Sequence, residues 1–196
     1  LQDAGIQKIA SRLELNAGTA VWGEGIRLDA FKLQTREQLQ PRKKITIVTI
    51  PASQQVFKSV LTIVQPQIVY WVGIDPKLDE LSAFLKRLSG IGKFLADKRG
   101  GKTELSSLAG AMAHAIETVQ LGLQWLNSKG VFQIQIEENG QIEFSFPTDQ
   151  KHGSMENIEK ALRSQLSEAK AYRKFIHTMT PEERKVYIRG LINGYE

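Results

Sequence analysis

Two patterns in the 196-residue sequence predict an α/β fold. The first is a strand, a helix and a second strand between Ile45 and Val72, an order that is typical of a βαβ crossover. The second, between Lys102 and Phe146, is a pair of short helices followed by two strands of alternating apolar residues. We therefore expect a small Rossmann-like βαβ unit, a winged-helix unit and a C-terminal helical tail. The expected ranges of these three parts are 1–76, 77–149 and 150–196.

Short apolar patterns predict the elements of the first part. Residues 2–15 carry apolar side chains at helical spacing, and Thr19–Trp22 has the pattern of a strand. A β-branched run over Ile45–Ile50 suits a buried strand. A helix is expected to open at Pro51-Ala52-Ser53, and a further strand follows over Gln67–Val72. Because a crossover connects them, these last two strands are predicted to be parallel.

The second part is predicted to contain three helices and a hairpin. A long helix is expected from Asp75-Pro76, because its apolar residues, Phe94 among them, keep helical phase. Thr103 is the expected cap of the next helix. The third helix ends at Lys129-Gly130, since glycine tolerates the left-handed conformation. Two alternating strands then flank Asn139-Gly140, which is a tight-turn signal.

The tail is expected to be helical. An amphipathic pattern runs from Met155 to about His177. Thr180-Pro181 then indicates the start of a shorter helix with proline in its first position.

The composition is that of an ordinary globular protein, with 41% hydrophobic and 24% charged residues. The chain has no cysteine, which excludes disulfides, thiolate catalysis and cysteine-ligated zinc and fits a reducing cytoplasm. No apolar run approaches the ~20 residues that span a bilayer, so no membrane is expected. The sequence begins without Met or a signal-peptide pattern. We expect a fragment of a longer cytoplasmic protein.

Positive charge is segregated away from the expected winged helix. The net charge is +5 with a pI of ≈ 9.4, yet residues 103–149 hold one lysine, Lys129, against six acids. Phosphate binding needs lysine or arginine to displace counterions, whereas the hairpin carries Glu137, Glu138 and Glu143. The side chains expected to be exposed on the third helix are Glu117, Thr118, Gln120, Gln124, Asn127 and Ser128.

The sequence predicts no catalytic, cofactor or metal site. His114, His152 and His177 have no companion at metal-ligand spacing. Gly23-Glu24-Gly25 matches part of a phosphate loop, but no Lys-Ser or Lys-Thr follows, so we interpret it as a turn. The βαβ unit has no glycine at Ile50–Ser53 to admit a pyrophosphate and is interpreted as a scaffold.

The predicted binding surface is cationic and lies outside the acidic region. Clusters of lysine and arginine on several elements are able to follow a nucleic-acid backbone or bind an acidic partner. The candidate residues are Arg42, Lys43, Lys44, Lys86, Arg87, Lys93, Lys98, Arg99 and Lys102. A further series, expected on the late helix, consists of Arg163, Lys170, Arg173 and Lys174.

Three segments in a fixed order resemble a known family. They are Ile47–Trp71, Phe84–Leu95 (FLKRLSGIGKFL) and Glu104–Ile134 (ELSSLAGAMAHAIETVQLGLQWLNSKGVFQI). The chain resembles the C-terminal domain of RecJ-type single-stranded-DNA-specific exonucleases, in the extended form of cyanobacteria and some Gram-positive bacteria. The resemblance covers roughly residues 18–146.

The resemblance implies a function in DNA recombination and repair. RecJ enzymes degrade single-stranded DNA from the 5′ end, using metal-binding aspartates and histidines in an N-terminal core that includes an Asp-His-His motif. This chain has no Asp-His-His, so no catalytic residue is carried over, and Mg²⁺ or Mn²⁺ is expected only in the missing core. In some relatives the C-terminal extension binds partner proteins, including the acidic tail of single-strand-binding protein. The expectation is therefore a non-catalytic accessory domain that binds single-stranded DNA or a repair partner.

Two alternatives stay open. A winged-helix transcription regulator would bind duplex DNA with a sequence preference, although its third helix lacks basic residues before Lys129. A purely structural interaction module would bind no nucleic acid.

Overall fold

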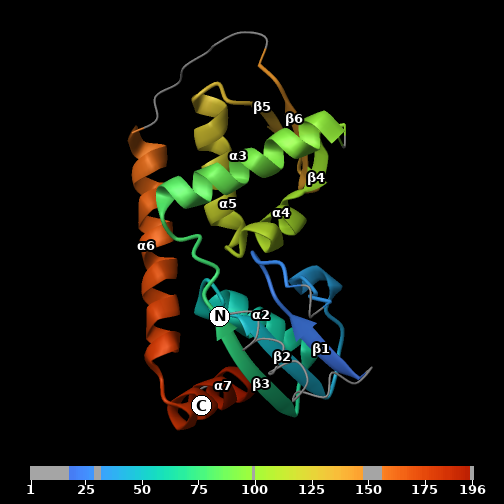
Figure 1. Cartoon of the computed structure of the whole chain (residues 1–196), viewed down its shortest axis with the longest axis vertical. Coiled ribbons are helices and arrows are strands. Elements are labelled where there is room, and N and C mark those ends of the chain that lie inside the picture. Colours follow the sequence, from blue (N-terminus) through green and yellow to red (C-terminus); the bar gives the residue numbers. More distant parts are fainter. Residues whose placement is uncertain (1–17, 29–31, 99, 148–155, 195–196) are drawn as a thin grey trace. The chain divides into compact units, whose positions relative to one another are not determined.

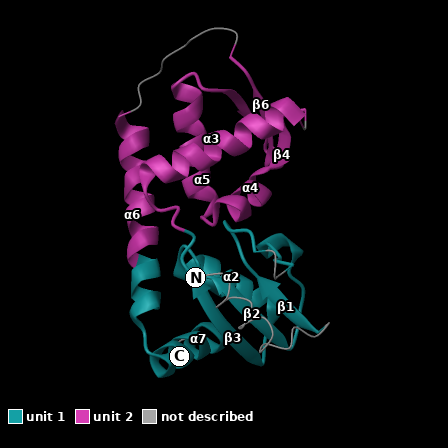
Figure 2. Cartoon of the chain, viewed as in Figure 1, with its two compact units in different colours: residues 1–76, 172–196 teal, residues 77–171 magenta. Residues whose placement is uncertain are grey.

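The computed structural model describes residues 18–28, 32–98, 100–147 and 156–194. The protein has a mixed α/β fold, as the sequence predicts, with a small parallel sheet and a small antiparallel sheet. The chain forms two compact units, which we call unit 1 (1–76 and 172–196) and unit 2 (77–171) (Figure 2). The tail expected over 150–196 therefore contributes to both units. The helix expected over residues 2–15 lies outside the described residues.

Unit 1 is built on a three-stranded parallel sheet in the order β1-β2-β3 (Figure 1). Its strands are β1 (Thr19–Trp22), β2 (Lys44–Thr49) and β3 (Ile68–Ile74). The central strand β2 is buried from Ile45 onward, because its β-branched side chains fill both faces of the sheet. The predicted parallel pairing of β2 with β3 is confirmed, with Ile45 beside Val69.

Helix α2 (Gln54–Val64) connects β2 to β3. Its start is fixed by Ser53, whose side chain accepts a hydrogen bond from the Val56 N–H at 3.2 Å. It ends at Gln65, which has a left-handed backbone (φ 51°) and donates its N–H to Leu61 O. The side chains that it buries are Val56, Phe57, Val60, Leu61 and Val64.

Two helices supply the C-terminal residues of unit 1. They are α6 (Glu156–Thr178), whose residues are shared between the units, and α7 (Pro181–Asn193). Thr180 and Glu183 form a capping box at the start of α7, since the Thr180 N–H donates to the Glu183 carboxylate at 2.8 Å and the Glu183 N–H donates to the Thr180 hydroxyl at 3.3 Å. Buried apolar side chains of this segment are Ile176, Ile188 and Leu191.

Before its share of α6, unit 2 has the order helix, strand, helix, helix, strand, strand (Figure 1). Its strands form an antiparallel sheet in the order β4-β6-β5, and β5 and β6 are joined through the expected turn at Asn139-Gly140. The elements are α3 (Leu81–Lys98), β4 (Lys102–Glu104), α4 (Leu105–Met112), α5 (Ile116–Ser128), β5 (Gln133–Ile136) and β6 (Gln141–Ser145).

One apolar core joins the helices and strands of unit 2. Its members include Phe84, Leu88, Leu108, Met112, Leu123, Phe144, Leu162 and Leu166. Two helical glycines allow the elements to approach closely. A Cβ added to Gly122 of α5 would lie 2.6 Å from the Phe84 ring, and one added to Gly92 of α3 would lie 3.0 Å from the Phe144 ring.

Two predicted helix starts in unit 2 are wrong. Helix α3 begins at Leu81 rather than at Asp75-Pro76, and Lys77 has a left-handed backbone (φ 58°) that no α-helix continues. Thr103 is not a cap, because it lies in β4 and pairs with Ile142. At three residues β4 is too short to show an alternating pattern.

Candidate nucleic-acid interface

The outer face of α3 carries exposed lysines. Lys86 and Lys93 are seven residues apart, about two helical turns, so both lie on one side of the helix. Lys98 is the last residue of α3. All three side chains are exposed, and none forms an ion pair with a described residue. Asp97 is the acid on this side, which leaves the face with net positive charge.

An exposed aromatic ring lies on the same face. Phe94 follows Lys93 directly and is 54% exposed, although the sequence predicts it on the apolar side of the helix. Lysines beside an open ring combine phosphate neutralisation with base stacking. The sequence did not single out Phe94, because a ring at the edge of an apolar stripe has the same spacing as a core residue. We call Lys86, Lys93, Phe94 and Lys98 the α3 face.

The remaining candidates near α3 have other environments. The Arg87 Nε donates to Ala111 O at 3.1 Å, and burial lowers the pKa of its guanidinium. Lys102 Nζ lies 4.0 Å from a carboxylate oxygen of Glu143. Arg99 lies outside the described residues. Arg87 and Lys102 are therefore each engaged with neighbouring groups of unit 2.

The candidates Arg42, Lys43 and Lys44 belong to unit 1. Arg42 and Lys43 are exposed, whereas Lys44 is half-buried as the first residue of β2. Backbone hydrogen bonds hold this segment, since the Arg42 N–H donates to Val64 O at 2.9 Å and the Ile68 N–H donates to Lys43 O at 3.0 Å. The backbone is thus fixed while the two leading side chains stay accessible.

In the cationic series expected along the late helix, Lys174 is exposed, whereas the other three residues are paired or buried. Arg163 is paired with a glutamate one turn earlier in the same helix. Lys170 pairs with Glu80, and its hydrogen bond lowers the pKa of that carboxyl. Arg173 is buried and donates from Nε to Ile50 O at 3.2 Å. Most of the charge of this series is therefore neutralised or buried.

The surface of α5 and the hairpin is acidic, as the sequence predicts. Glu117 and Gln124 are exposed, but Thr118, which was also expected to be exposed, is buried. Asn127 is exposed and accepts a hydrogen bond from the Ile134 N–H at 3.1 Å, so it ties α5 to β5. The exposed acids of the hairpin formed by β5 and β6 are Glu137, Glu138 and Glu143. A phosphate backbone would be repelled here.

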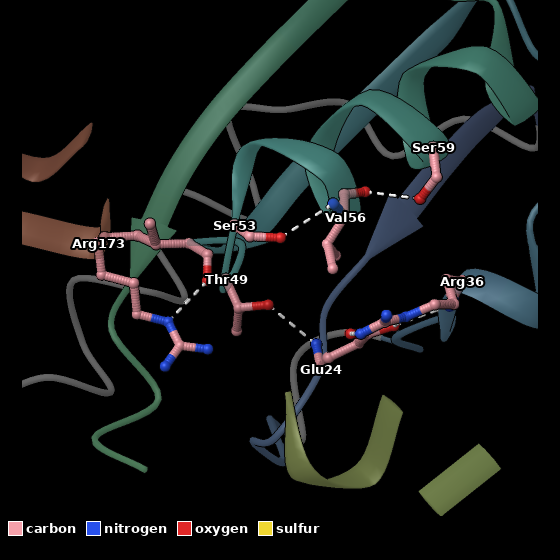
Figure 3. A network of polar contacts seen from close by, with 8 residues as sticks. Glu24, Arg36, Thr49, Ser53, Val56, Ser59 and Arg173 are labelled. Carbon is pink, nitrogen blue, oxygen red and sulfur yellow. Dashed lines mark hydrogen bonds and ion pairs between the residues drawn. The ribbon is translucent and has the colours of Figure 1, made fainter. Parts of the chain in front are cut away.

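A buried polar network closes the carboxyl end of the parallel sheet (Figure 3). The Glu24 side chain is 2% exposed and pairs with Arg36, whose Nε lies 2.9 Å from Oε1. The Glu24 N–H donates to Thr49 Oγ1 at 2.9 Å, which links the end of β1 to the end of β2. Open α/β sheets commonly bind phosphate-bearing ligands at this edge. A buried carboxylate there suits a structural turn and disfavours a phosphate.

His114 fits a structural role. Its ring is buried, with Nε2 3.1 Å from Leu78 O and 3.3 Å from Asp79 Oδ1. The Phe84 ring meets it edge-on at 5.2 Å. Among the described residues, no three or more histidine or carboxylate side chains are grouped so as to hold a metal ion. The described helices also include none with the length and apolar character needed to cross a membrane.

The chain matches no family model, no curated protein and no solved structure. The resemblance to RecJ-type exonucleases therefore rests on the sequence segments alone.

Proposed function

We propose that the chain is the non-catalytic C-terminal accessory domain of a RecJ-type exonuclease and that it holds single-stranded DNA while a separate core cuts. The observation that carries this proposal is the α3 face, where exposed lysines and an exposed phenylalanine ring lie on one helix. Lysines attract the phosphate backbone, and an open ring stacks on an unpaired base of any identity. Both contacts suit a single strand, since duplex bases stack on one another.

In this proposal unit 2 is a winged helix. The order α3, β4, α4, α5, β5, β6 and the sheet order β4-β6-β5 support that assignment. Helix α5 then takes the position of a recognition helix, but its acidic surroundings favour packing or protein contact over groove reading. Unit 1 is, in the same proposal, a Rossmann-like scaffold, for which the parallel strands and the crossover helix α2 are the support.

Three lysine substitutions test the α3 face. Lys86→Gln, Lys93→Gln and Lys98→Gln are combined, and Lys58→Gln, Lys160→Gln and Lys174→Gln serve as a matched control. The control removes the same charge from exposed lysines that have no described ion pair. Binding of a labelled oligothymidine is measured by fluorescence anisotropy at several salt concentrations. The logarithm of the binding constant falls linearly as the logarithm of the salt concentration rises, with a slope of about −0.7 per single-strand phosphate contact. We expect the α3 triple variant to make this slope less negative by about 2, because it removes three such contacts.

Phe94→Ala separates stacking from charge. We expect it to weaken oligothymidine binding by about 1–3 kcal/mol, the usual contribution of one stacked base, while the salt slope stays unchanged. Equal losses of oligothymidine affinity in the α3 triple variant and its control would exclude the α3 face as the DNA-binding surface.

Titrations with other ligands distinguish the alternatives. Tighter binding to a duplex of one sequence would favour a transcription regulator, and the absence of any nucleic-acid binding would favour a structural interaction module. Binding of the acidic tail of single-strand-binding protein, with no binding of oligothymidine, would make a repair partner the ligand in place of DNA.

A further inference from the structure

A groove of about 400 Å³ lies in unit 1 between the start of β3 and helix α7. Figure 1 labels the two elements. From β3 and the residue before it, Gln67, Ile68, Val69 and Trp71 line one wall. The other wall is α7. Ile68 of β3 and Ile192 of α7 are 44% and 41% exposed, so both walls offer accessible apolar surface. None of the described candidate residues chosen from the sequence lines this groove.

One stripe of α7 faces the groove. Its lining residues recur at spacings of one and three, so they share one side of the helix. They are Pro181, Arg184, Lys185, Ile188, Arg189 and Ile192. Lys185 and Arg189 are exposed and form no ion pair with a described residue. Among the described residues that line the groove, none is acidic. The groove is therefore apolar at its base and cationic along one rim.

The wall formed by β3 is an edge of the described sheet. In the order β1-β2-β3, strand β3 pairs on one side only among the strands that the structure describes. The Ile68 N–H donates to Lys43 O, toward β2. Backbone groups alternate in direction along a strand, so those of Val69 and Trp71 point toward the free edge. Neither residue forms a described backbone hydrogen bond outside the ladder.

We propose that this groove binds an acidic peptide that carries apolar side chains and adds to β3 as an extended strand. Addition to a sheet edge supplies backbone hydrogen bonds, and pockets for alternate side chains supply selectivity. The peptide carboxylates would meet Lys185 and Arg189, and its apolar side chains would cover Ile68 and Ile192. The proposal concerns unit 1 alone and does not depend on DNA binding by the α3 face.

The groove suits a peptide better than a nucleic acid. Binding of single strands normally uses open aromatic faces for stacking. The Trp71 ring is not open for stacking, because the Arg184 guanidinium lies 4.9 Å from its ring centroid and the Phe57 ring centroid lies 6.0 Å from it. The exposed apolar residues, Ile68 and Ile192, complement aliphatic side chains instead.

The charge contribution is tested with the labelled peptide Asp-Asp-Ile-Asp-Ile-Asp-Asp. Lys185→Glu with Arg189→Glu is compared with Lys58→Glu with Lys174→Glu, a matched charge reversal at exposed sites of unit 1. We expect the first pair to raise the Kd at least about tenfold, a loss of roughly 1.4 kcal/mol, and the second to leave it nearly unchanged. Equal effects of the two pairs would overturn the proposal. The proposal would also be overturned if oligothymidine displaced the peptide from the parent protein and failed to bind the Lys185→Glu, Arg189→Glu variant. The groove would then be a nucleic-acid site.

The strand geometry is tested on the peptide, so the protein fold is left intact. Two isomers of the heptapeptide carry the same number of backbone N-methyl groups, one at positions 2, 4 and 6 and the other at positions 3, 5 and 7. Only one set of N–H groups faces β3 in a paired strand, so we expect one isomer to lose binding and the other to keep it. Unchanged binding of both isomers would exclude strand addition.

Discussion

At the scale of single residues, the ion pair between Glu24 and Arg36 shows how one buried carboxylate holds a distant part of the chain in place. The Glu24 carboxylate also accepts a hydrogen bond from the Arg36 backbone N–H at 3.0 Å, so one carboxylate fixes both the side chain and the backbone of its partner. A buried pair of this kind costs desolvation energy, and removing one partner leaves the other charge without compensation.

Glu24→Gln is expected to destabilise unit 1 strongly. Loss of one partner of a buried ion pair typically costs about 3–5 kcal/mol, and here the remaining guanidinium of Arg36 is 14% exposed. Urea unfolding followed by circular dichroism measures the change. Glu182→Gln removes an exposed carboxylate of the same unit and should change the free energy of unfolding by less than about 0.5 kcal/mol. A loss no larger than that of Glu182→Gln would mean that the pair is not needed for stability.

Single residues also mark the limit of prediction from sequence. The turn at Gly23-Glu24-Gly25 was expected, but its partner Arg36 is twelve positions away and leaves no local pattern. Exposure of Phe94 and burial of Thr118 depend on which neighbours cover each helix. Helical spacing gives the direction of a side chain relative to its own helix, and tertiary packing then decides what meets it.

At the scale of elements, β2, α2 and β3 were predictable because each carries a strong local pattern with clear ends. The start of α3 and the strand β4 were not. Leu78 keeps helical phase with the apolar residues of α3, yet the left-handed backbone of Lys77 prevents a helix from starting at Asp75-Pro76. Strand β4 exists because β6 pairs with it, with Lys102 beside Glu143, and such a long-range partner has no signature in three residues.

Two glycines in the helices of unit 2 are expected to respond oppositely to alanine. Gly122→Ala places a methyl group 2.6 Å from the Phe84 ring and 2.7 Å from Leu88, so overpacking should cost about 1–3 kcal/mol. Gly90 lies in open space on α3, and Gly90→Ala should stabilise by up to about 1 kcal/mol through helix propensity. Thermal unfolding of the two variants measures the difference. Similar changes of one sign would contradict the close contact between α3 and α5.

The capping box of α7 predicts a dependence on pH. Hydrogen bonds from the Thr180 backbone and hydroxyl lower the pKa of the Glu183 carboxyl. Because the folded pKa lies below the unfolded pKa, this stabilisation is present above the unfolded value and is lost as the pH falls through the folded value.

Thr180→Ala tests the box directly. We expect a loss of about 1 kcal/mol in stability at neutral pH, and the Glu183 pKa should return toward its ordinary value in an NMR titration. Glu182→Gln, which removes the neighbouring exposed carboxylate, serves as the control and should change the stability by less than about 0.5 kcal/mol. A Glu183 titration that is unaffected by the substitution would show that the hydrogen bonds do not form.

At the scale of the whole molecule, unit 1 is assembled from two distant stretches of chain. Residues 172–196 bring Ile176, Ile188 and Leu191 into buried positions. Unit 2 consists of the continuous stretch 77–171. The sequence predicted a boundary after residue 76 from the pattern of its elements, but the division of the late helix depends on which core each of its turns contacts.

Truncation after Ala171 is expected to affect the two units differently. It removes α7 and Arg173 from unit 1, whereas the unit 2 core, including Leu162 and Leu166, is retained. Tryptophan fluorescence reports each unit separately, because Trp22 and Trp71 lie in unit 1 and Trp125 lies in unit 2.

Two tryptophan backgrounds distinguish the responses. With Trp125→Phe, the emission of the truncated chain should shift toward longer wavelength as unit 1 loosens. With Trp22→Phe and Trp71→Phe, the emission of Trp125 should change little on truncation. A native-like spectrum in the first background would mean that the first 76 residues need no C-terminal helix.

The same division of the chain has a consequence for biosynthesis. Within the stretch 1–196, the strands of the parallel sheet leave the ribosome before unit 2, but the helical residues 172–196 that complete unit 1 are made only after unit 2. The middle stretch is complete earlier and is free to collapse on its own. Until then the apolar side chains of the nascent sheet stay partly exposed to solvent, and exposed strand edges favour aggregation. Chaperone contact during synthesis should therefore concentrate on the first 76 residues rather than on those that follow.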